Sequence, residues 1–202
     1  MNSYRNRVLI LGNGPDINNI DFDRLKGNIK TAGVNRIWLK HFPDYYFYHD
    51  SEISKEIERD IIVKSKIMAK CKCYSSDWIR RRMSTVPSYL KVVNRSNPTA
   101  FVDSVTTFMR ILISDNVFSI DDTIFYISGV PLSWSEPSHF WKEIDYEGSL
   151  NKHGRDWYDP RFNRIVSNFK RLKGLGYNMI SVTPHSKLNK IMRYEGVSNL
   201  YA

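Results

Sequence analysis

A short apolar run, Arg7–Leu11, ends abruptly at Gly12-Asn13-Gly14-Pro15, and these two segments limit the possible folds more than any other part of the chain. An apolar run closed by glycine and proline predicts a buried strand followed by a tight turn. Glycine lets the backbone turn sharply and come close to a neighbour or a ligand. A plain strand-to-helix turn would need the same residues, so the turn alone does not indicate a ligand site.

Further apolar segments follow the same plan along the chain. Strands are expected at Ile29–Val34, Tyr45–Tyr48, Lys66–Ala69, Thr123–Ile127 and Asn178–Val182. Helices are expected at Ser51–Val63, around Val105–Ile113, from Asp159-Pro160 to the glycines 174 and 176, and at Lys187–Met192. Strands that alternate with helices indicate an α/β fold with one doubly wound, mostly parallel sheet, which is a Rossmann-like arrangement.

The length of 202 residues fits a single nucleotide-binding domain that spans residues 1–202. The segment around 70–97 has no clear period and is expected to be a variable excursion. A polar, tryptophan-rich loop is expected around 130–157. No repeat, low-complexity tract or linker divides the chain.

The composition indicates an anionic partner. Hydrophobic residues make up 42% of the chain, enough for a sizeable core, and the net charge is +9 with a pI of about 9.5. Cys71-Lys72-Cys73 is spaced too closely for an unstrained disulfide, so both thiols are expected to be free in a reducing cytoplasm. The chain contains neither a signal-peptide pattern nor an apolar run of about 18 residues, so we expect a cytoplasmic protein without a membrane span.

Ligands of open parallel sheets bind outside the carboxyl ends of the strands. The residues just past the expected strands are Gly12–Asp16, Asn35, His49-Asp50, Ser128–Pro131 and Thr183–Ser186. The first turn lacks both the full Gly-x-Gly-x-x-Gly spacing and an acidic residue about 20 positions later, which disfavours a dinucleotide site. We therefore expect a nucleotide of another kind at this edge.

The order of these motifs resembles that of the bacterial monofunctional sialyltransferases, which use CMP-sialic acid. It equally resembles a wider group of domains that includes archaeal 6-hydroxymethylpterin diphosphokinase. The motifs are Gly12-Asn13-Gly14-Pro15, Gly33-Val34-Asn35-Arg36, Pro43-Asp44-Tyr45-Tyr46, Thr106-Thr107, Ile124–Gly129 and Thr183-Pro184-His185-Ser186. They cover nearly the whole chain. Each is short, and it is their order that implies a shared fold.

The resemblance implies a role for each matching position. Asn13 and Asn35 would hydrogen-bond the base or the ribose of the nucleotide. Thr106 and Thr107 stand where the sialyltransferases carry serines beside the cytidine phosphate. The remaining expected nucleotide-binding residues are Gly12, Gly14, Pro15, Asp50, Ser128 and Gly129.

Two departures from the family pattern leave the base and the sugar of the donor open. The family has an acid two residues after the glycine of its Gly-hydrophobic-Asp motif, whereas this chain has Gly129-Val130-Pro131-Leu132. Thr107-Phe108 replaces a Ser-Gly pair, which would reshape the pocket.

Sugar transfer requires a general base for the acceptor hydroxyl, most naturally a histidine. His153 precedes the expected Asp159 helix, as the family histidine precedes its own helix, and His139 is the alternative. Arg155 and Tyr158 are candidates to neutralise the leaving phosphate. For both histidines, a structural role as a loop residue that hydrogen-bonds a neighbour is an equally good interpretation.

The sequence thus favours a glycosyltransferase that moves a sugar from a nucleotide-sugar donor to an anionic acceptor, either an acidic glycan or modified DNA such as a phage makes. No metal is expected, although Asp21-Phe22-Asp23 imitates the Asp-x-Asp of metal-dependent transferases. One alternative is a Mg²⁺-dependent diphosphotransferase like the pterin kinases, which would need convergent carboxylates. Another is a non-enzymatic binder of nucleotide or nucleic acid.

Overall fold

The computed structural model describes residues 4–25, 27, 29–94, 103–132, 140 and 155–202, with only the backbone of 155–159. Its centre is one eight-stranded, entirely parallel sheet with the order β5-β4-β3-β2-β1-β6-β7-β8. The strands are β1 (Asn6–Leu11), β2 (Ile29–Val34), β3 (Tyr45–Phe47), β4 (Lys72–Ser76), β5 (Leu90–Val93), β6 (Thr123–Ser128), β7 (Asn178–Ser181) and β8 (Arg193–Tyr194). The expected doubly wound α/β fold is confirmed.

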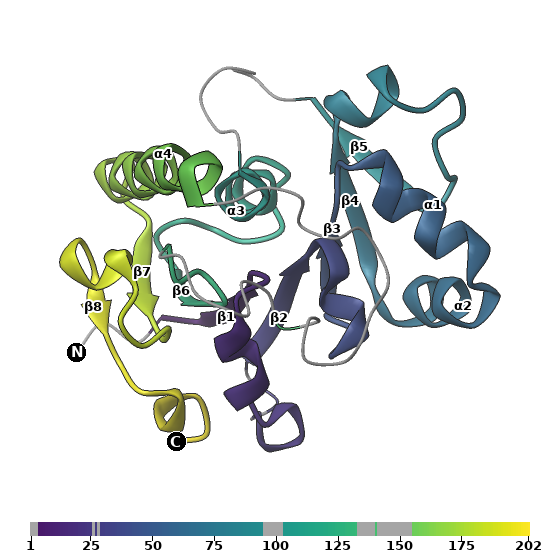
Figure 1. Ribbon diagram of the computed structural model, residues 1–202. Coiled ribbons are helices and arrows are strands. Elements are labelled where there is room, and N and C mark those ends of the chain that lie inside the picture. The colour runs from purple at the N-terminus through teal and green to yellow at the C-terminus, as the bar shows by residue number, and fades with distance from the viewer. Residues whose placement is uncertain (1–3, 26, 28, 95–102, 133–139, 141–154) are drawn as a thin grey trace.

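Helices cover both faces of the sheet (Figure 1). The α-helices in the described part of the chain are α1 (Ser51–Arg59), α2 (Ile61–Lys70), α3 (Ser104–Ser114) and α4 (Arg155–Gly174). Short 3-10 helices take up much of the remaining connections, namely η1 (Pro15–Asn19), η2 (Phe22–Arg24), η3 (Asn35–Leu39), η4 (Asp77–Arg81), η6 (Lys187–Lys190) and η7 (Val197–Leu200). The connections after β1 and β2 contain only such 3-10 helices.

The alternation of side chains along β1 divides the core into two layers. Val8 and Ile10 pack on the face that α3 and α4 cover, whereas Leu9 and Leu11 pack on the face of α1, α2, η1 and η7. All four side chains are fully buried, as expected for a central strand between two helical layers. Figure 1 shows α3 and α4 side by side on their face.

The expected helix Ser51–Val63 is in fact two helices. Asp60 adopts an extended conformation, and its carboxylate accepts hydrogen bonds from the backbone N–H groups of Ile62 and Val63, which starts α2. The expected strand Lys66–Ala69 was wrong, because it lies inside α2. Its apolar residues favour a strand by composition. Ile67 alone among them is buried, because only one face of helix α2 packs on the protein.

Other boundaries also differ from the expectations. Within the expected excursion 70–97, the described residues 70–94 contribute β4 and β5 to the sheet. Helix α4 begins at Arg155, so the helix start expected at Asp159-Pro160 was wrong and Pro160 lies within the helix. The glycine stop was right, because α4 ends at Gly174 and Gly176 has a φ of +90°.

Candidate functional site

The chain builds the sheet outward from β1 to β5, and then returns to add β6 on the other side of β1. The connection after β1 and the connection after β6 leave the sheet in opposite directions. The adjacent carboxyl ends of these two strands are therefore the topological switch point of the sheet. The two turns are joined directly, because the N–H of Gly12 donates to Ser128 O at 2.8 Å and the N–H of Gly14 donates to Gly129 O at 2.8 Å. We therefore take the carboxyl ends of β1 and β6 as the candidate site.

The glycines of these turns are explained by their mutual packing. A Cβ on Gly12 would lie 2.3 Å from the carbonyl oxygen of Gly129, and one on Gly14 would lie 2.5 Å from Cδ of Pro131. Gly129 itself has a φ of +72°, which is in the region that favours glycine. The turns thus need glycine without any ligand, so the glycines by themselves are no evidence for one.

Asp16 connects the ends of three strands. Its Oδ2 accepts hydrogen bonds from Gly129 N at 2.9 Å, Thr183 Oγ1 at 2.9 Å and Ser128 Oγ at 3.2 Å. The β6 turn therefore has a carboxylate beside it, although Pro131 stands where the sialyltransferases carry their acid. Asp16 stands among the residues that follow the expected strands, but the sequence suggested no role for it. The signal that could have found it is an acid directly after the Gly-Pro turn.

Two buried acceptor atoms of the β1 turn have no hydrogen-bond partner among the residues that the structure describes. They are Oδ1 of Asn13 and Oδ1 of Asp16. A buried polar atom without a partner costs roughly 1–3 kcal/mol, so native proteins seldom leave one in place without a ligand or water. The turn can therefore receive hydrogen-bond donors from a bound molecule.

Asn35 follows β2 on the same edge and is held in a left-handed conformation with a φ of +55°. Its backbone carbonyl accepts a hydrogen bond from the hydroxyl of Tyr46, and its Oδ1 accepts one from Ser104 Oγ at 3.4 Å. The next residue, Arg36, is nearly buried and pairs with Glu56 on α1 through both its Nε and Nη2. The backbone of Asn35 is thus held by β3, its neighbour Arg36 is held by α1, and its side chain is bound from α3.

Thr106 and Asp50 have partners within the fold. Thr106 is fully buried, and both its N–H and its hydroxyl donate to Asp103, the residue that caps α3. Thr107 is also buried, with 3% of its surface exposed. Asp50 caps α1 by accepting a hydrogen bond from Glu52 N at 3.1 Å. These contacts account for Thr106 and Asp50 without a nucleotide.

The proposed catalytic residues are not placed by the structure. His153 and His139 lie outside the described residues. Arg155 and Tyr158 lie in the first turns of α4, where only the backbone is described.

No group of three or more His, Cys, Asp and Glu that could hold a metal ion occurs in the described part of the chain. The Asp-x-Asp pattern serves a local purpose, because Asp21 caps η2 by accepting a hydrogen bond from Asp23 N. His41 has structural contacts, since its Nε2 lies 3.4 Å from Thr31 Oγ1 and its ring stacks on Phe22. Burial lowers the pKa of His41.

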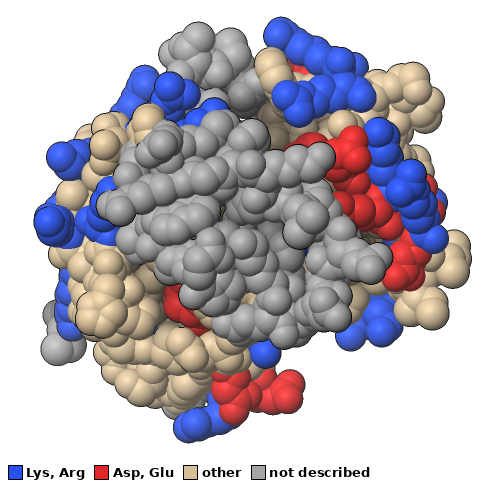
Figure 2. Space-filling view, viewed as in Figure 1, with Lys and Arg blue, Asp and Glu red and all other residues tan. Residues whose placement is uncertain are grey.

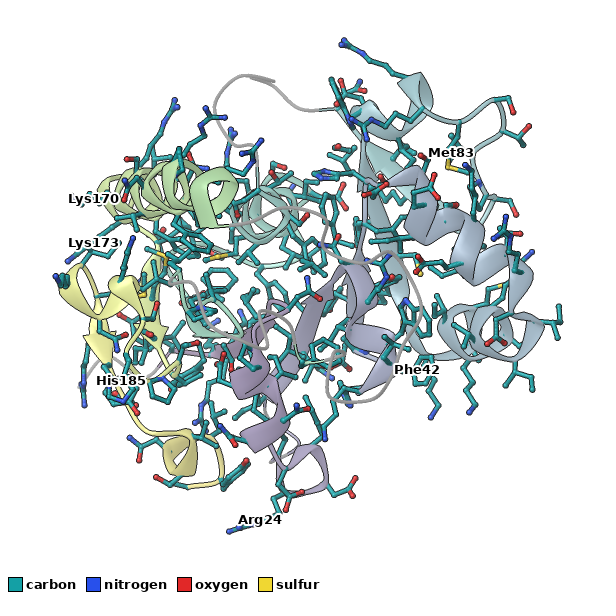
Figure 3. All side chains as sticks on the ribbon, viewed as in Figure 1. Arg24, Phe42, Met83, Lys170, Lys173 and His185 are labelled. Carbon is teal, nitrogen blue, oxygen red and sulfur yellow. The ribbon has the colours of Figure 1, made fainter. Side chains whose placement is uncertain are left out.

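Basic side chains lie on both flanks of the face in Figure 2, whereas Asp and Glu form a patch on the right, where α1 runs. The run Arg80-Arg81-Arg82 follows β4, so it lies at the same edge of the sheet as the turns of β1 and β6, and all three side chains are exposed. The guanidinium groups of Arg81 and Arg82 lie 5.6 and 5.1 Å from the ring centre of Trp78. Lys170 and Lys173 extend from α4 at the opposite margin (Figure 3).

Fold and edge together define an open α/β protein with a candidate ligand site at the switch point of its sheet. No protein-family model matches the chain, and no curated protein does. Two solved structures of the sialyltransferase CstII from Campylobacter jejuni are similar to it. One is a complex with the substrate analogue CMP-3FNeuAc, with 13% identity, a TM-score of 0.57, and 94% of this chain and 86% of that chain covered. The other is a complex with cytidine-5'-monophosphate, with 13% identity, a TM-score of 0.61, and 96% and 87% covered.

At this identity the likeness concerns the fold alone. The chain has a sialyltransferase-like α/β fold, as the order of its motifs implied. No described helix is long and apolar enough to cross a membrane.

Proposed function

We propose that the protein is a glycosyltransferase that binds a nucleotide-sugar donor over the turns of β1 and β6 and transfers the sugar to an anionic acceptor. The observation that carries this proposal is the buried Oδ1 of Asn13, which lacks a partner at the switch point of the sheet. Asn35, on the neighbouring strand end, is the second contact to the nucleotide.

The chemistry of the turn indicates which part of the donor lies there. The unpaired atoms of Asn13 and Asp16 are acceptors, so they need N–H or O–H groups from the ligand. Ribose hydroxyls and the amino group of a base supply such donors, whereas a phosphate offers only acceptors and would be repelled by Asp16. The nucleoside end of the donor therefore belongs at this turn, with the phosphate farther away.

Two further observations support sugar transfer. The similar structures are those of a sialyltransferase bound to a CMP-sugar analogue and to CMP. The net charge of +9 and the exposed arginines 80–82 at the same edge favour an acidic acceptor, a glycan or DNA. Neither observation distinguishes the two acceptors.

The chemical step needs a base and a group that neutralises the leaving phosphate. The acceptor hydroxyl gives its proton to an imidazole, which we assign to His153 or His139. The oxygen of the acceptor hydroxyl then bonds to the anomeric carbon of the sugar. The bond from that carbon to the phosphate oxygen breaks, and its electron pair leaves with the phosphate. Arg155 and Tyr158 would stabilise the negative charge that develops there.

The site assignment is tested by measuring nucleotide affinity by calorimetry, after a thermal-shift screen of CMP, UDP, GDP, ADP and ATP with and without Mg²⁺. Asn13→Ala and Asn35→Ala should each weaken binding by about 1–3 kcal/mol, because a donor of the ligand loses its acceptor. Asn19→Ala, at an exposed asparagine of η1, is the matched control. Unchanged affinity in both site variants would contradict the assignment, and a shift that requires both ATP and Mg²⁺ would favour a diphosphotransferase.

The general base is tested with a turnover assay on the donor that binds. His153→Ala should retain nucleotide binding but lose about 10²–10⁴-fold in rate, as is typical when a general base is removed. A loss of activity in His139→Ala but not in His153→Ala would assign the general base to His139. Full activity in both variants would rule out both histidines, and binding without any turnover in the unmodified protein would leave a non-enzymatic binder.

A further inference from the structure

Helix α2 exposes most of its large apolar side chains. Ile61, Ile62 and Met68 are 70%, 64% and 54% exposed, and they account for three of the five large hydrophobic residues that are exposed in the described part of the chain. Ile67 is the buried residue of this helix. Apolar groups clustered on one exposed helix mark a surface that contacts a partner or a membrane, whereas scattered ones need no explanation.

Lysines stand beside these apolar side chains. Lys66 and Lys70 are exposed, and their Nζ atoms lie 5.8 and 5.9 Å from the ring centre of Phe42. Figure 3 labels Phe42 at this margin of the molecule. Neither lysine pairs with an acidic residue in the described part of the chain, in contrast to Lys64, which binds Glu58 at 2.7 Å. The C-terminal half of α2 is therefore apolar and cationic, whereas the exposed Asp60 stands at its N-terminal end.

We propose that α2 docks onto an anionic lipid surface, lying flat with Ile61, Ile62 and Met68 in the boundary between headgroups and acyl chains. Apolar side chains flanked by lysines are the usual composition of an interfacial helix, and each lysine near an anionic surface strengthens its binding. Helix α2 has ten residues, about 15 Å in length, which is suited to lying on a bilayer and too short to cross one.

Charge and position favour lipid over a second copy of the chain. In a symmetric pair of parallel α2 helices, Lys66 and Lys70 of both copies would come together and repel each other. An anionic bilayer instead supplies the opposite charge to Lys66 and Lys70. Helix α2 lies at the outer margin of the molecule, beyond β4, which leaves it accessible to an extended surface (Figure 1).

The experiment measures co-sedimentation of the full chain with vesicles of phosphatidylcholine alone and of phosphatidylcholine with phosphatidylglycerol at about 3:1. We expect binding to the anionic vesicles only. Ile61→Ser with Ile62→Ser should weaken it at least about tenfold. Lys66→Gln with Lys70→Gln should weaken it by about fivefold per lysine, and added salt should do the same.

Matched controls come from the other side of the molecule. Leu175→Ser changes an apolar residue that is 54% exposed, and Lys170→Gln with Lys190→Gln removes two exposed lysines. Both controls should bind as the unmodified chain does, and melting curves verify that every variant is folded. The proposal is overturned if the unmodified chain does not bind anionic vesicles, or if the controls lose as much affinity as the α2 variants. It is also overturned if the isoleucine changes dissociate a dimer while vesicle binding persists.

Discussion

The carboxylate of Asp16 binds groups that are 112, 113 and 167 positions further along the chain. Each of these contacts closes a long loop, so none is visible as a local pattern in the sequence. By accepting from Ser128, Gly129 and Thr183, Asp16 holds the carboxyl ends of β1, β6 and β7 at fixed distances. This side chain and the backbone hydrogen bonds between the two glycine turns together hold the edge where we place the nucleotide.

Asp16→Ala should therefore destabilise the protein. Gly129 N and the hydroxyls of Ser128 and Thr183 would lose a charged acceptor, which lowers the free energy of unfolding by about 3 kcal/mol. Urea denaturation measures this quantity, and Asp23→Ala, at an exposed acid of η2, serves as the control. A loss in Asp16→Ala no larger than in the control would mean that the three hydrogen bonds do not contribute to stability.

At the scale of elements, capping residues decide where helices start and how they join. Asp103 caps α3 and also accepts a hydrogen bond from Asn168 on α4 at 2.8 Å, so one carboxylate links both helices of this face. Burial raises the pKa of Asp103, although its hydrogen bonds act in the opposite direction. The hydroxyl of Thr106 donates to the carboxylate of Asp103. The fold therefore has a structural use for the hydroxyl of Thr106.

The connection between η3 and β3 carries a pH-dependent contribution to stability. Burial lowers the pKa of His41 from its ordinary value of 6.5, so the folded protein favours the neutral ring. As the pH falls through 6.5, the unfolded chain takes up this proton first, and the free energy of unfolding decreases. This contribution is present above pH 6.5 and is lost on acidification.

His41→Gln should therefore flatten the change in unfolding free energy between about pH 7.5 and about pH 5. Chemical denaturation across this range is the measurement, with His185→Gln at an exposed histidine as the control. If the pH dependence of His41→Gln equals that of the unmodified protein, His41 does not couple protonation to folding.

The whole molecule is organised around the position of β1 in the middle of the sheet. Because β2 to β5 extend on one side and β6 to β8 on the other, the turns after β1 and β6, which are far apart in sequence, meet at the carboxyl ends of these two strands. The same arrangement places the basic run after β4 and the turns after β1 and β6 on one edge. Fold, edge and charge agree with a protein that holds a nucleotide and an anionic second substrate, as we propose.

The central elements could be predicted from the sequence because their signals are local. The strand expected at Ile29–Val34 is β2, and the helical face from Val105 to Ile113 lies in α3. Strand β1 was recognised by its run of buried residues. These segments are covered by other elements, so their apolar residues repeat with the period of the backbone.

Other features were decided only by the tertiary structure. The short edge strands β5 and β8 have few buried residues, so their sequences show no clear strand period. The apolar pattern of Ser51–Val63 runs across Asp60 without interruption, so the sequence does not show that α1 ends and α2 begins there. The candidate site shows the same division. Local turn chemistry was enough to find Gly12–Pro15, whereas the role of Asp16 and the contacts that hold Asn35 depend on residues brought together by the strand order.

Sequence alone thus determined the buried strands and their turns, because backbone period and turn geometry are local. The partners of each polar side chain at the sheet edge were decided by tertiary structure, because hydrogen bonds depend on which strand ends become neighbours.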